Sequence, residues 1–340
     1  MSTLYAITPR KEITPKPDIG LHQIIAPISE DLVSVDRHIG EQLVSDVELI
    51  RQMTAYLLGA GGKRLRPTTL LLATKALNYR GTGHITLAAV IELIHTATLI
   101  HDDVVDKSVL RRGQKTANEI WGNSASILVG DFIYSRSFEM MVTVNRPQVM
   151  EIMASTTNAI AEGEVMQLLH SHSPDVDETD YIATIERKTA RLFQSAAHLA
   201  AVLAGADAPS EKALMAFGLN LGISFQISDD LLDYSASSQT IGKNPGDDLA
   251  DGKCTLPLIH ALQHGTRIEK KLIRSAIETG DRTKLGAIQK IIQSTRSISY
   301  ASKRASEFAM AAKSHLNILP ESVFVTALCN LANFSASRIY

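Results

Sequence analysis

The stretch that decides the fold covers residues 91–113 and reads IELIHTATLIHDDVVDKSVLRRG. Its apolar residues recur at helical spacing, which predicts one long helix with a buried side, ending in a basic turn. His95, Asp102 and Asp106 are separated by seven and then four residues, so this helix presents all three on another face. Together with Asp103, the aspartates lie in the last helical turns, where the helix dipole disfavours negative charge. Folding alone gives little reason for this arrangement, whereas bound divalent cations would remove the repulsion.

Length and composition restrict the class of protein. The chain has 340 residues, of which 45% are hydrophobic and 21% charged, values typical of a globular protein with a sizeable core. Gly and Pro are sparse, with 20 and 11 residues, which predicts a mostly helical, all-α chain. The formal net charge of −2 lacks the basic footprint of a nucleic-acid-binding protein. Cys254 and Cys329 show no paired spacing, as expected for a protein of the reducing cytoplasm.

Residues 1–25 contain prolines among charges and lack the apolar core of a signal peptide, so we expect a flexible tail. Residues 26–340 show no linker and no fixed-period repeat, which predicts a single all-helical domain. No apolar run reaches the ~20 residues needed to cross a bilayer, so no transmembrane segment is expected. Ser210 would cap one helix. The helices are expected near residues 30–58, 67–77, 84–107, 116–121, 124–144, 147–170, 179–204, 210–234, 255–263, 267–279, 281–294, 298–316 and 320–335.

A basic cluster, GGKRLRP, occupies residues 61–67. Its glycines would let backbone N–H groups approach an anion, and Lys63 and Arg66 add positive charge where Pro67 can start a helix. The alternative is a solvated basic turn. The cluster is not a phosphate-binding Walker loop, because the spacing G-x-x-x-x-G-K-[ST] is absent.

A second acidic cluster lies in FQISDDLLDY, residues 225–234. Asp229, Asp230 and Asp233 repeat the spacing D-D-x-x-D, and Gln226 lies one turn upstream on the same face. Two such clusters, each inside an apolar helix, predict a shared site for Mg²⁺, which binds carboxylates together with substrate phosphates. A zinc site would need His or Cys ligands at tetrahedral spacing, which are missing. His95 becomes a candidate phosphate ligand, with an ordinary core histidine as the alternative.

A polar loop at residues 242–253 follows the second acidic helix. Lys243 and Lys253 could close over a bound polyanion, unless the loop is simply solvated. Lys188 and Thr189 lie inside an expected helix and can reach the same cavity. Acids and bases in comparable number describe a site where Mg²⁺ bridges diphosphates to aspartates while cations hold the outer oxygens.

At these residues the chain resembles trans-type (E) polyprenyl diphosphate synthases over essentially all of residues 30–340. The resemblance rests on five motifs in the family's order: GGKRLRP, HDDVVDKSVLRRG, KTARLF, FQISDDLLDY and GKNPGDDLADGKCTLPL. Residues 95–141 are most similar to bacterial octaprenyl diphosphate synthases of the quinone pathway. The resemblance implies an isoprenoid synthase fold, in which about ten or more helices surround a central cavity, and a cytoplasmic homodimer.

The resemblance also implies roles for individual residues and about three Mg²⁺ per active site with substrate bound. The metal set would be Asp102, Asp103, Asp106, Asp229 and Asp233, with Asp102, Asp106 and Asp229 holding Mg²⁺ and Asp103, Asp230 and Asp233 nearby or acting through water. The six aspartates and Lys188 form the catalytic set. Isopentenyl diphosphate would be held by Lys63, Arg66, His95 and Arg112. The allylic diphosphate would be held by Arg111, Lys188, Thr189, Gln226, Lys243 and Lys253.

The implied reaction is a repeated head-to-tail condensation. Mg²⁺ and the cations stabilise the leaving diphosphate, so the allylic C–O bond ionises. The double bond of isopentenyl diphosphate attacks the carbocation, and a proton is then lost to the released diphosphate. By resemblance, farnesyl diphosphate is extended to octaprenyl diphosphate for a quinone side chain, with a transient membrane contact for product release.

Product length can be argued partly from the acidic helix. Ala97 and Thr98 precede Asp102 by five and four residues, so they flank the route down from the metal site. Both are small and would not stop a growing chain. Met141 and Met153 are candidates for the tunnel floor, or are ordinary core methionines. A shorter-chain, geranylgeranyl-type synthase and a non-catalytic subunit of a heteromeric synthase are the alternatives, although a non-catalytic subunit would have eroded aspartate clusters.

Overall fold

Helices make up almost all of the computed structural model, which describes residues 20–59, 61–234 and 246–337. This confirms the predicted all-helical class. In chain order the elements are α1 (Leu21–Ile25), the 3₁₀ helix η1 (Ala26–Ile28), α2 (Ser29–Gln42), α3 (Glu48–Gly59), α4 (Leu65–Ala76), α5 (Gly83–Val105), β1 (Leu110–Arg111), β2 (Gln114–Lys115), α6 (Ala117–Trp121), α7 (Asn123–Thr143), α8 (Pro147–His170), α9 (Glu178–Ile185), the π-helix η2 (Glu186–Ala190), α10 (Arg191–Ala204), α11 (Ala208–Leu232), α12 (Asp247–Ala250), α13 (Leu256–His264), α14 (Arg267–Thr279), the 3₁₀ helix η4 (Arg282–Lys284), α15 (Leu285–Ser294), α16 (Ser297–His315), the 3₁₀ helix η5 (Leu316–Ile318) and α17 (Val323–Ser337).

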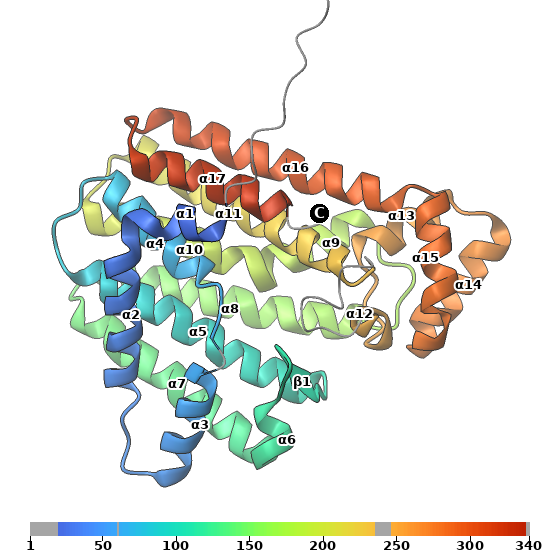
Figure 1. Cartoon of the computed structure of the whole chain (residues 1–340), viewed down its shortest axis with the longest axis horizontal. Coiled ribbons are helices and arrows are strands. Elements are labelled where there is room, and N and C mark those ends of the chain that lie inside the picture. Colours follow the sequence, from blue (N-terminus) through green and yellow to red (C-terminus); the bar gives the residue numbers. More distant parts are fainter. Residues whose placement is uncertain (1–19, 60, 235–245, 338–340) are drawn as a thin grey trace, which may run out of the picture.

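The first acidic helix, α5, lies in the middle of the bundle (Figure 1). Its residues 87–94 are all buried, because α2, α4, α7 and α10 pack around it. A helix that is apolar on all sides belongs in a core. The central position of α5 therefore carries its acidic C-terminal turns into the interior of the protein.

By length and composition, α5 also resembles a membrane-spanning helix. It is the one helix among the described residues that does so, with 23 residues and a mean hydropathy of 1.5 over its most apolar window. However, 61% of that window is buried inside the protein. Packing in the core therefore accounts for its apolar surface.

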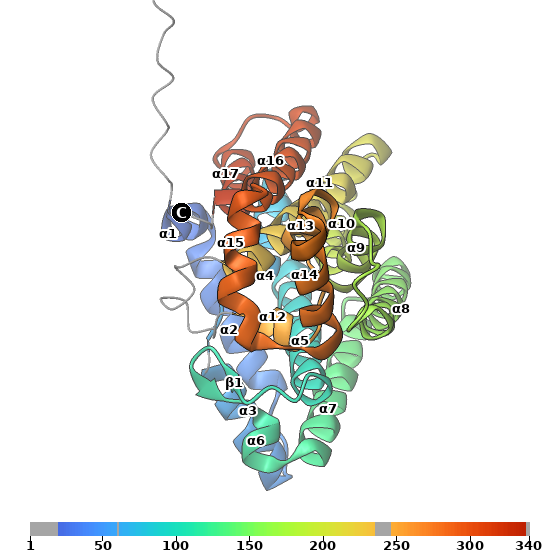
Figure 2. The same ribbon diagram turned by 90° about the vertical axis from the view of Figure 1, so that its right-hand side faces the viewer.

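Two hydrophobic clusters share the long helix α11. Phe217 and Leu221, in its first half, belong to the larger cluster with α2, α4, α5, α7, α8, α10 and α17. Ile227 and Leu231, in its second half, belong to a smaller cluster with α9, α13, α14, α15 and α16. Figure 2 shows α14 and α15 side by side at one end of the molecule, near α12. The second acidic cluster lies on the half of α11 that faces this end.

Several element boundaries differ from the predicted ones. The expected helix 30–58 is interrupted between α2 and α3, where the N–H of Val47 donates to Ser45 Oγ at 3.2 Å and competes with helical bonding. The expected helix 179–204 contains the π-helical turn η2, which a search for the 3.6-residue period does not detect. Asp207, rather than Ser210, caps α11, since its carboxylate accepts the N–H of Ser210 at 3.0 Å.

Two local structures were not expected from the sequence. β1 and β2 form a short antiparallel hairpin, because Arg112 and Gly113 adopt φ values of 54° and 76°, as a type I′ turn requires. In the expected tail, residues 21–25 form α1, and Ile24 is buried in the larger hydrophobic cluster. Residues 1–19 of that tail lie outside the described residues.

Candidate active site

A cavity of about 590 Å³ is lined by residues from elements of both hydrophobic clusters. Its walls come from the start of α4, the C-terminal turns of α5, α8 and α11, the helix α9, the π-helix η2 and the residues around α12. Both aspartate clusters and the basic cluster at residues 61–67 therefore contribute to one cavity, although they are far apart in the sequence.

The first aspartate cluster faces the cavity through Asp102 and Asp106, and each of them pairs with a lysine. Lys188 Nζ lies 3.4 Å from Asp102 Oδ2. Lys253 Nζ lies 3.0 Å from Asp106 Oδ2 and 2.8 Å from Asp251 Oδ2. These acids raise the pKa of Lys253 although burial lowers it. The two lysines offset the repulsion between the carboxylates and come from segments that precede and follow α11.

The carboxylate of Asp103 points to Arg111 and does not line the cavity. Both of its carboxylate oxygens accept hydrogen bonds from Arg111, at 2.7–3.0 Å. Burial raises the pKa of Asp103, and the pairing with Arg111 counteracts that shift. Asp103 therefore fixes the guanidinium of Arg111 at the cavity wall.

The second aspartate cluster is divided in the same way. Asp229 lines the cavity. Asp233 is buried and accepts the backbone N–H groups of Gly246, Asp247 and Asp248 at 3.0–3.2 Å, so it caps the start of α12. Because this cap joins α11 to the segment that carries Lys253, it positions the lysine over the cavity.

Asp230 is also held by the protein. Its carboxylate accepts from the hydroxyl of Tyr181 and from Gln226 Nε2, both at 2.6 Å. Burial, followed by repulsion from Asp248, raises the pKa of Asp230 to about 7. Of the six predicted aspartates, five line the cavity, namely Asp102, Asp106, Asp229, Asp230 and Asp233.

The π-helix η2 carries Lys188 and Thr189. Lys188 Nζ lies 2.6 Å from Glu164 Oε2, in addition to its contact with Asp102, and Thr189 Oγ1 donates to Gln226 Oε1 at 2.9 Å. Burial and the nearby charge of Asp102 raise the pKa of Glu164 to about 7. Single π-turns in helices are frequent at functional sites, and this one directs both side chains into the cavity.

Lys63, Arg66, His95 and Arg112 also line the cavity and form its basic wall. Arg66 is packed over the ring of Phe193, 4.6 Å from its centroid, and burial lowers its pKa to about 10. Within the described chain, Arg66 Nε has no hydrogen-bond partner. A buried donor without a partner is costly, and an anion in the cavity would satisfy it.

The surroundings of His95 and Arg112 describe the rest of this basic wall. Burial and the surrounding arginines lower the pKa of His95 well below its usual value, so its ring is neutral near pH 7. A Cβ at Gly62 would lie 3.1 Å from Arg112 Nη1, so the guanidinium of Arg112 packs closely against the glycine. Arg64 differs from Arg66, because it pairs with Glu92 at 2.6 Å and Asp36 at 3.0 Å and has a structural role.

The predicted chain-length residues divide into two groups. Thr98 lines the cavity. Ala97, Met141 and Met153 are completely buried and belong to the larger hydrophobic cluster, on α5, α7 and α8 respectively. Lys243, predicted to bind the allylic diphosphate, lies outside the described residues.

The donor set fits a hard divalent cation. Asp102, Asp106 and Asp229 supply oxygen ligands of the kind that Mg²⁺ prefers, whereas a zinc site would favour histidine or cysteine. Among the described residues, no group of three or more His, Cys, Asp or Glu side chains is close enough to hold a metal by itself. Mg²⁺ commonly completes its coordination with water and substrate phosphates, so a diphosphate would have to supply the missing ligands.

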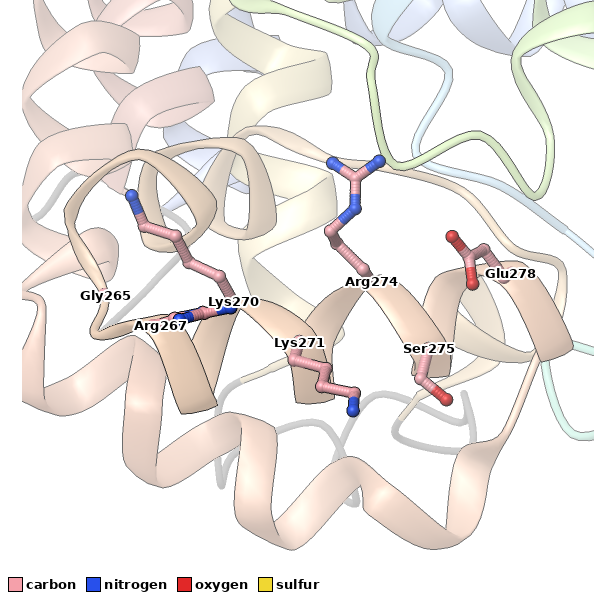
Figure 3. A pocket seen from close by; sticks show the side chains of 7 residues that line it. All are labelled: Gly265, Arg267, Lys270, Lys271, Arg274, Ser275 and Glu278. Atoms are coloured by element: carbon pink, nitrogen blue, oxygen red, sulfur yellow. The ribbon is translucent and has the colours of Figure 1, made fainter.

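A second hollow lies along α14, about 730 Å³ in volume (Figure 3). It is lined by the cations Arg267, Lys270, Lys271 and Arg274, with Glu278 as its single acid. No aspartate of the described chain lines this hollow, so it lacks the carboxylate ligands that would bind a metal in the main cavity.

Among the cavity residues that sequence reasoning missed are three whose side chains contact the predicted set. They are Glu164, which contacts Lys188, Tyr181, which contacts Asp230, and Asp251, which contacts Lys253. Tyr181 precedes Lys188 by seven residues, a spacing that could have indicated a shared helix face. The other two contacts join segments far apart or on a loop, so no local pattern predicts them.

An all-helical bundle with two aspartate clusters and a basic wall around one cavity has the architecture of an isoprenoid synthase. The chain belongs to the polyprenyl synthetase family, whose model matches residues 47–295. It is 46% identical to the octaprenyl diphosphate synthase of Escherichia coli (strain K12) over 321 residues, which are 94% of this chain and 99% of the relative.

Two further comparisons agree. The octaprenyl diphosphate synthase of Haemophilus influenzae is 48% identical over 311 residues, 91% of this chain and 94% of the relative. A polyprenyl synthase from Caulobacter crescentus CB15, complexed with calcium and isoprenyl diphosphate, superposes with a TM-score of 0.92 at 39% identity, over 96% of this chain and 100% of that one. The predictions of the family, the fold and a long-chain trans-type prenyltransferase are confirmed.

Proposed function

We propose that this enzyme adds isopentenyl diphosphate units to farnesyl diphosphate and releases octaprenyl diphosphate for a quinone side chain. The observation that carries the proposal is the pairing of two walls in one cavity. Asp102, Asp106 and Asp229 form its acidic wall, and Arg66, whose buried Nε has no hydrogen-bond partner within the described chain, belongs to its basic wall. Two diphosphates, one bound through metal and one through cations, fit this division.

At the acidic wall, Asp102, Asp106 and Asp229 would hold about three Mg²⁺ ions, which neutralise the leaving diphosphate. Lys188 and Lys253 already lie beside these carboxylates and would turn towards the outer oxygens of the allylic diphosphate. Its remaining ligands are proposed to be Arg111, Thr189, Gln226 and Lys243. At the basic wall, isopentenyl diphosphate would bind to Lys63, Arg66, His95 and Arg112.

The hydrogen bonds of Asp103, Asp230 and Asp233 support the indirect role that we expect for them from the sequence. Asp103 and Asp233 use both carboxylate oxygens to hold Arg111 and the start of α12. We propose that they act on the metal site through these contacts or through water. Asp230, held by Tyr181 and Gln226, would act in the same indirect way.

Product length is proposed to be set where α5, α7 and α8 meet. Incubation of the purified enzyme with farnesyl diphosphate, labelled isopentenyl diphosphate and Mg²⁺ is expected to yield mainly C40 products by mass spectrometry. Met153→Ala should shift the distribution to longer chains, because Met153 is completely buried and its truncation opens space for further apolar carbons. Met310→Ala, at a position 57% exposed on α16, is the matched control and should leave the distribution unchanged.

Other outcomes would separate the alternatives. A dominant C20 or C25 product from the wild-type enzyme would favour the shorter-chain synthase. Absence of condensation by folded protein would favour a non-catalytic subunit that needs a partner chain. An unchanged product distribution for Met153→Ala would show that this methionine only packs in the core.

The enzyme is further proposed to be a homodimer. Helices α7 and α8 follow each other in the chain and expose Leu128 (68%), Val165 (56%) and Leu169 (74%). Figure 2 shows α8 along one side of the molecule, where a second copy could cover it. Exposed apolar side chains gathered on consecutive helices mark association surfaces.

Sedimentation analysis is expected to give twice the chain mass of 37.0 kDa. Leu128→Glu should shift the species to the monomer, because a charge cannot be buried unpaired in an apolar interface. Ile268→Glu, at a residue 82% exposed on α14, is the control and should remain dimeric. A monomeric wild-type protein at micromolar concentration would refute the homodimer.

The proposed location is the cytoplasm, with a transient membrane contact when the product leaves. The apolar surface of α5 is used inside the fold. The long prenyl product is itself apolar, and each CH₂ moved from water to lipid gains about 0.8 kcal/mol.

A further inference from the structure

A chain of hydrogen bonds lies behind the second aspartate cluster. It starts at Tyr181 of α9, a side chain only 6% exposed, whose hydroxyl donates to Asp230 Oδ2 at 2.6 Å. The other carboxylate oxygen of Asp230, Oδ1, accepts Gln226 Nε2 at 2.6 Å. Gln226 Oε1 in turn accepts the hydroxyl of Thr189 at 2.9 Å. The four residues connect α9, η2 and α11.

The chemistry of these groups determines which partner donates in the hydrogen bonds of Gln226. An amide nitrogen only donates and an amide oxygen only accepts, so Gln226 Nε2 donates to Asp230 Oδ1 and Gln226 Oε1 accepts from Thr189. The amide of Gln226 is then fixed, with its oxygen towards Thr189 and its nitrogen towards Asp230. One N–H of that amide remains for a further acceptor, and Gln226 lines the cavity.

We propose that Tyr181 is a positioning residue for the allylic diphosphate. Its hydroxyl holds the carboxylate of Asp230 away from the metal-binding aspartates and thereby fixes the Gln226 amide and the Thr189 hydroxyl. The inference rests on the proposed function, in which Gln226 and Thr189 bind the allylic diphosphate.

Packing alone does not require the hydroxyl. Tyr181 belongs to the smaller hydrophobic cluster, and a phenylalanine ring would fill the same space. Without the hydroxyl, Asp230 Oδ2 would be buried and lack this donor, which favours rotation of the carboxylate towards the cavity. Gln226, which donates to the same carboxylate, would lose its fixed orientation.

The test uses Tyr181→Phe and the full-length enzyme. Binding of farnesyl thiolodiphosphate, which ionises very slowly, is measured by titration calorimetry in the presence of Mg²⁺ and without isopentenyl diphosphate. We expect the affinity to fall about tenfold, since without the Tyr181 hydroxyl the Gln226 amide and the Thr189 hydroxyl are no longer held in the binding orientation. The KM for isopentenyl diphosphate should stay within about twofold, because the hydrogen bonds lead to Gln226 and Thr189, which are proposed ligands of the allylic diphosphate only.

The matched control is Tyr300→Phe. Tyr300 of α16 donates its hydroxyl to Glu178, also on α9, so this variant removes the same kind of bond from the same helix away from the cavity. It should bind the analogue like the wild type. In a Gln226→Ala background, Tyr181→Phe should have almost no further effect, because both residues act through one chain.

If Tyr181→Phe is unstable, a second variant, Asp230→Asn, tests the same series of hydrogen bonds at the residue between Tyr181 and Gln226. It should produce the same selective loss of analogue affinity. Unchanged analogue affinity in either folded variant, or equal weakening of both substrates, would overturn the inference. A wild-type enzyme that neither binds the analogue nor condenses substrates would instead overturn the proposed function, and this inference with it.

Discussion

Replacement of Asp102 or Asp229 by asparagine is expected to lower kcat by about three orders of magnitude. Both aspartates line the cavity, on α5 and α11 respectively. An amide keeps the size of the side chain but removes the negative charge that a divalent cation requires. Steady-state condensation at saturating Mg²⁺ measures the effect, and circular dichroism with thermal unfolding checks that the helical fold persists.

Asp131→Asn is the control for this experiment. Asp131 is an exposed aspartate on α7, outside the cavity, so the same chemical change should leave kcat within about twofold. Turnover close to that of the wild type in Asp102→Asn or Asp229→Asn would contradict the metal assignment. A loss of fold in these variants would show instead that the two acids are structural.

The second large effect is expected from Gly163→Ala. A Cβ at Gly163 of α8 would lie 2.5 Å from the backbone nitrogen of Lys188 and 2.9 Å from its Cα. Backbone cannot rotate away, so η2 must move from α8, at a cost of about 1–3 kcal/mol for an overpacked core. Lys188 and Thr189 would move with it. We expect a lower midpoint of unfolding and about a hundredfold lower kcat/KM for the allylic substrate.

Gly40→Ala provides the matched control. Gly40 lies inside α2, and a Cβ there would meet nothing within 4 Å. Alanine is the better helix former by up to about 1 kcal/mol, so this variant should be slightly more stable and fully active. If Gly163→Ala behaved in the same way, the close approach of α8 to η2 would have no importance for the site.

Much of the site could be predicted from local sequence patterns. A carboxylate cluster inside an apolar helix conflicts with folding and therefore indicates function, and this reasoning found Asp102, Asp106 and Asp229. The glycine-flanked cations at residues 61–67 were found in a similar way. Helix positions followed from the 3.6-residue period, apart from the break between α2 and α3 and the π-turn η2.

Other features depend on contacts between distant segments. The pairing of Asp103 with Arg111, the cap that Asp233 forms on α12, and the contact between Glu164 and Lys188 have no periodic signature. Equivalent aspartates in the two clusters look alike in the sequence, yet their partners give them different tasks.

The sequence by itself determined the all-helical class, the two acidic helices and the family, because these depend on residue type and spacing along one element. Only the tertiary structure decided which aspartates face the cavity, that Arg66 rather than Arg64 keeps an unsatisfied donor, and that a π-turn aims Lys188. The physical reason is that burial and hydrogen bonding are properties of the surroundings of a side chain. Those surroundings come from segments brought together by packing, and no single segment encodes them.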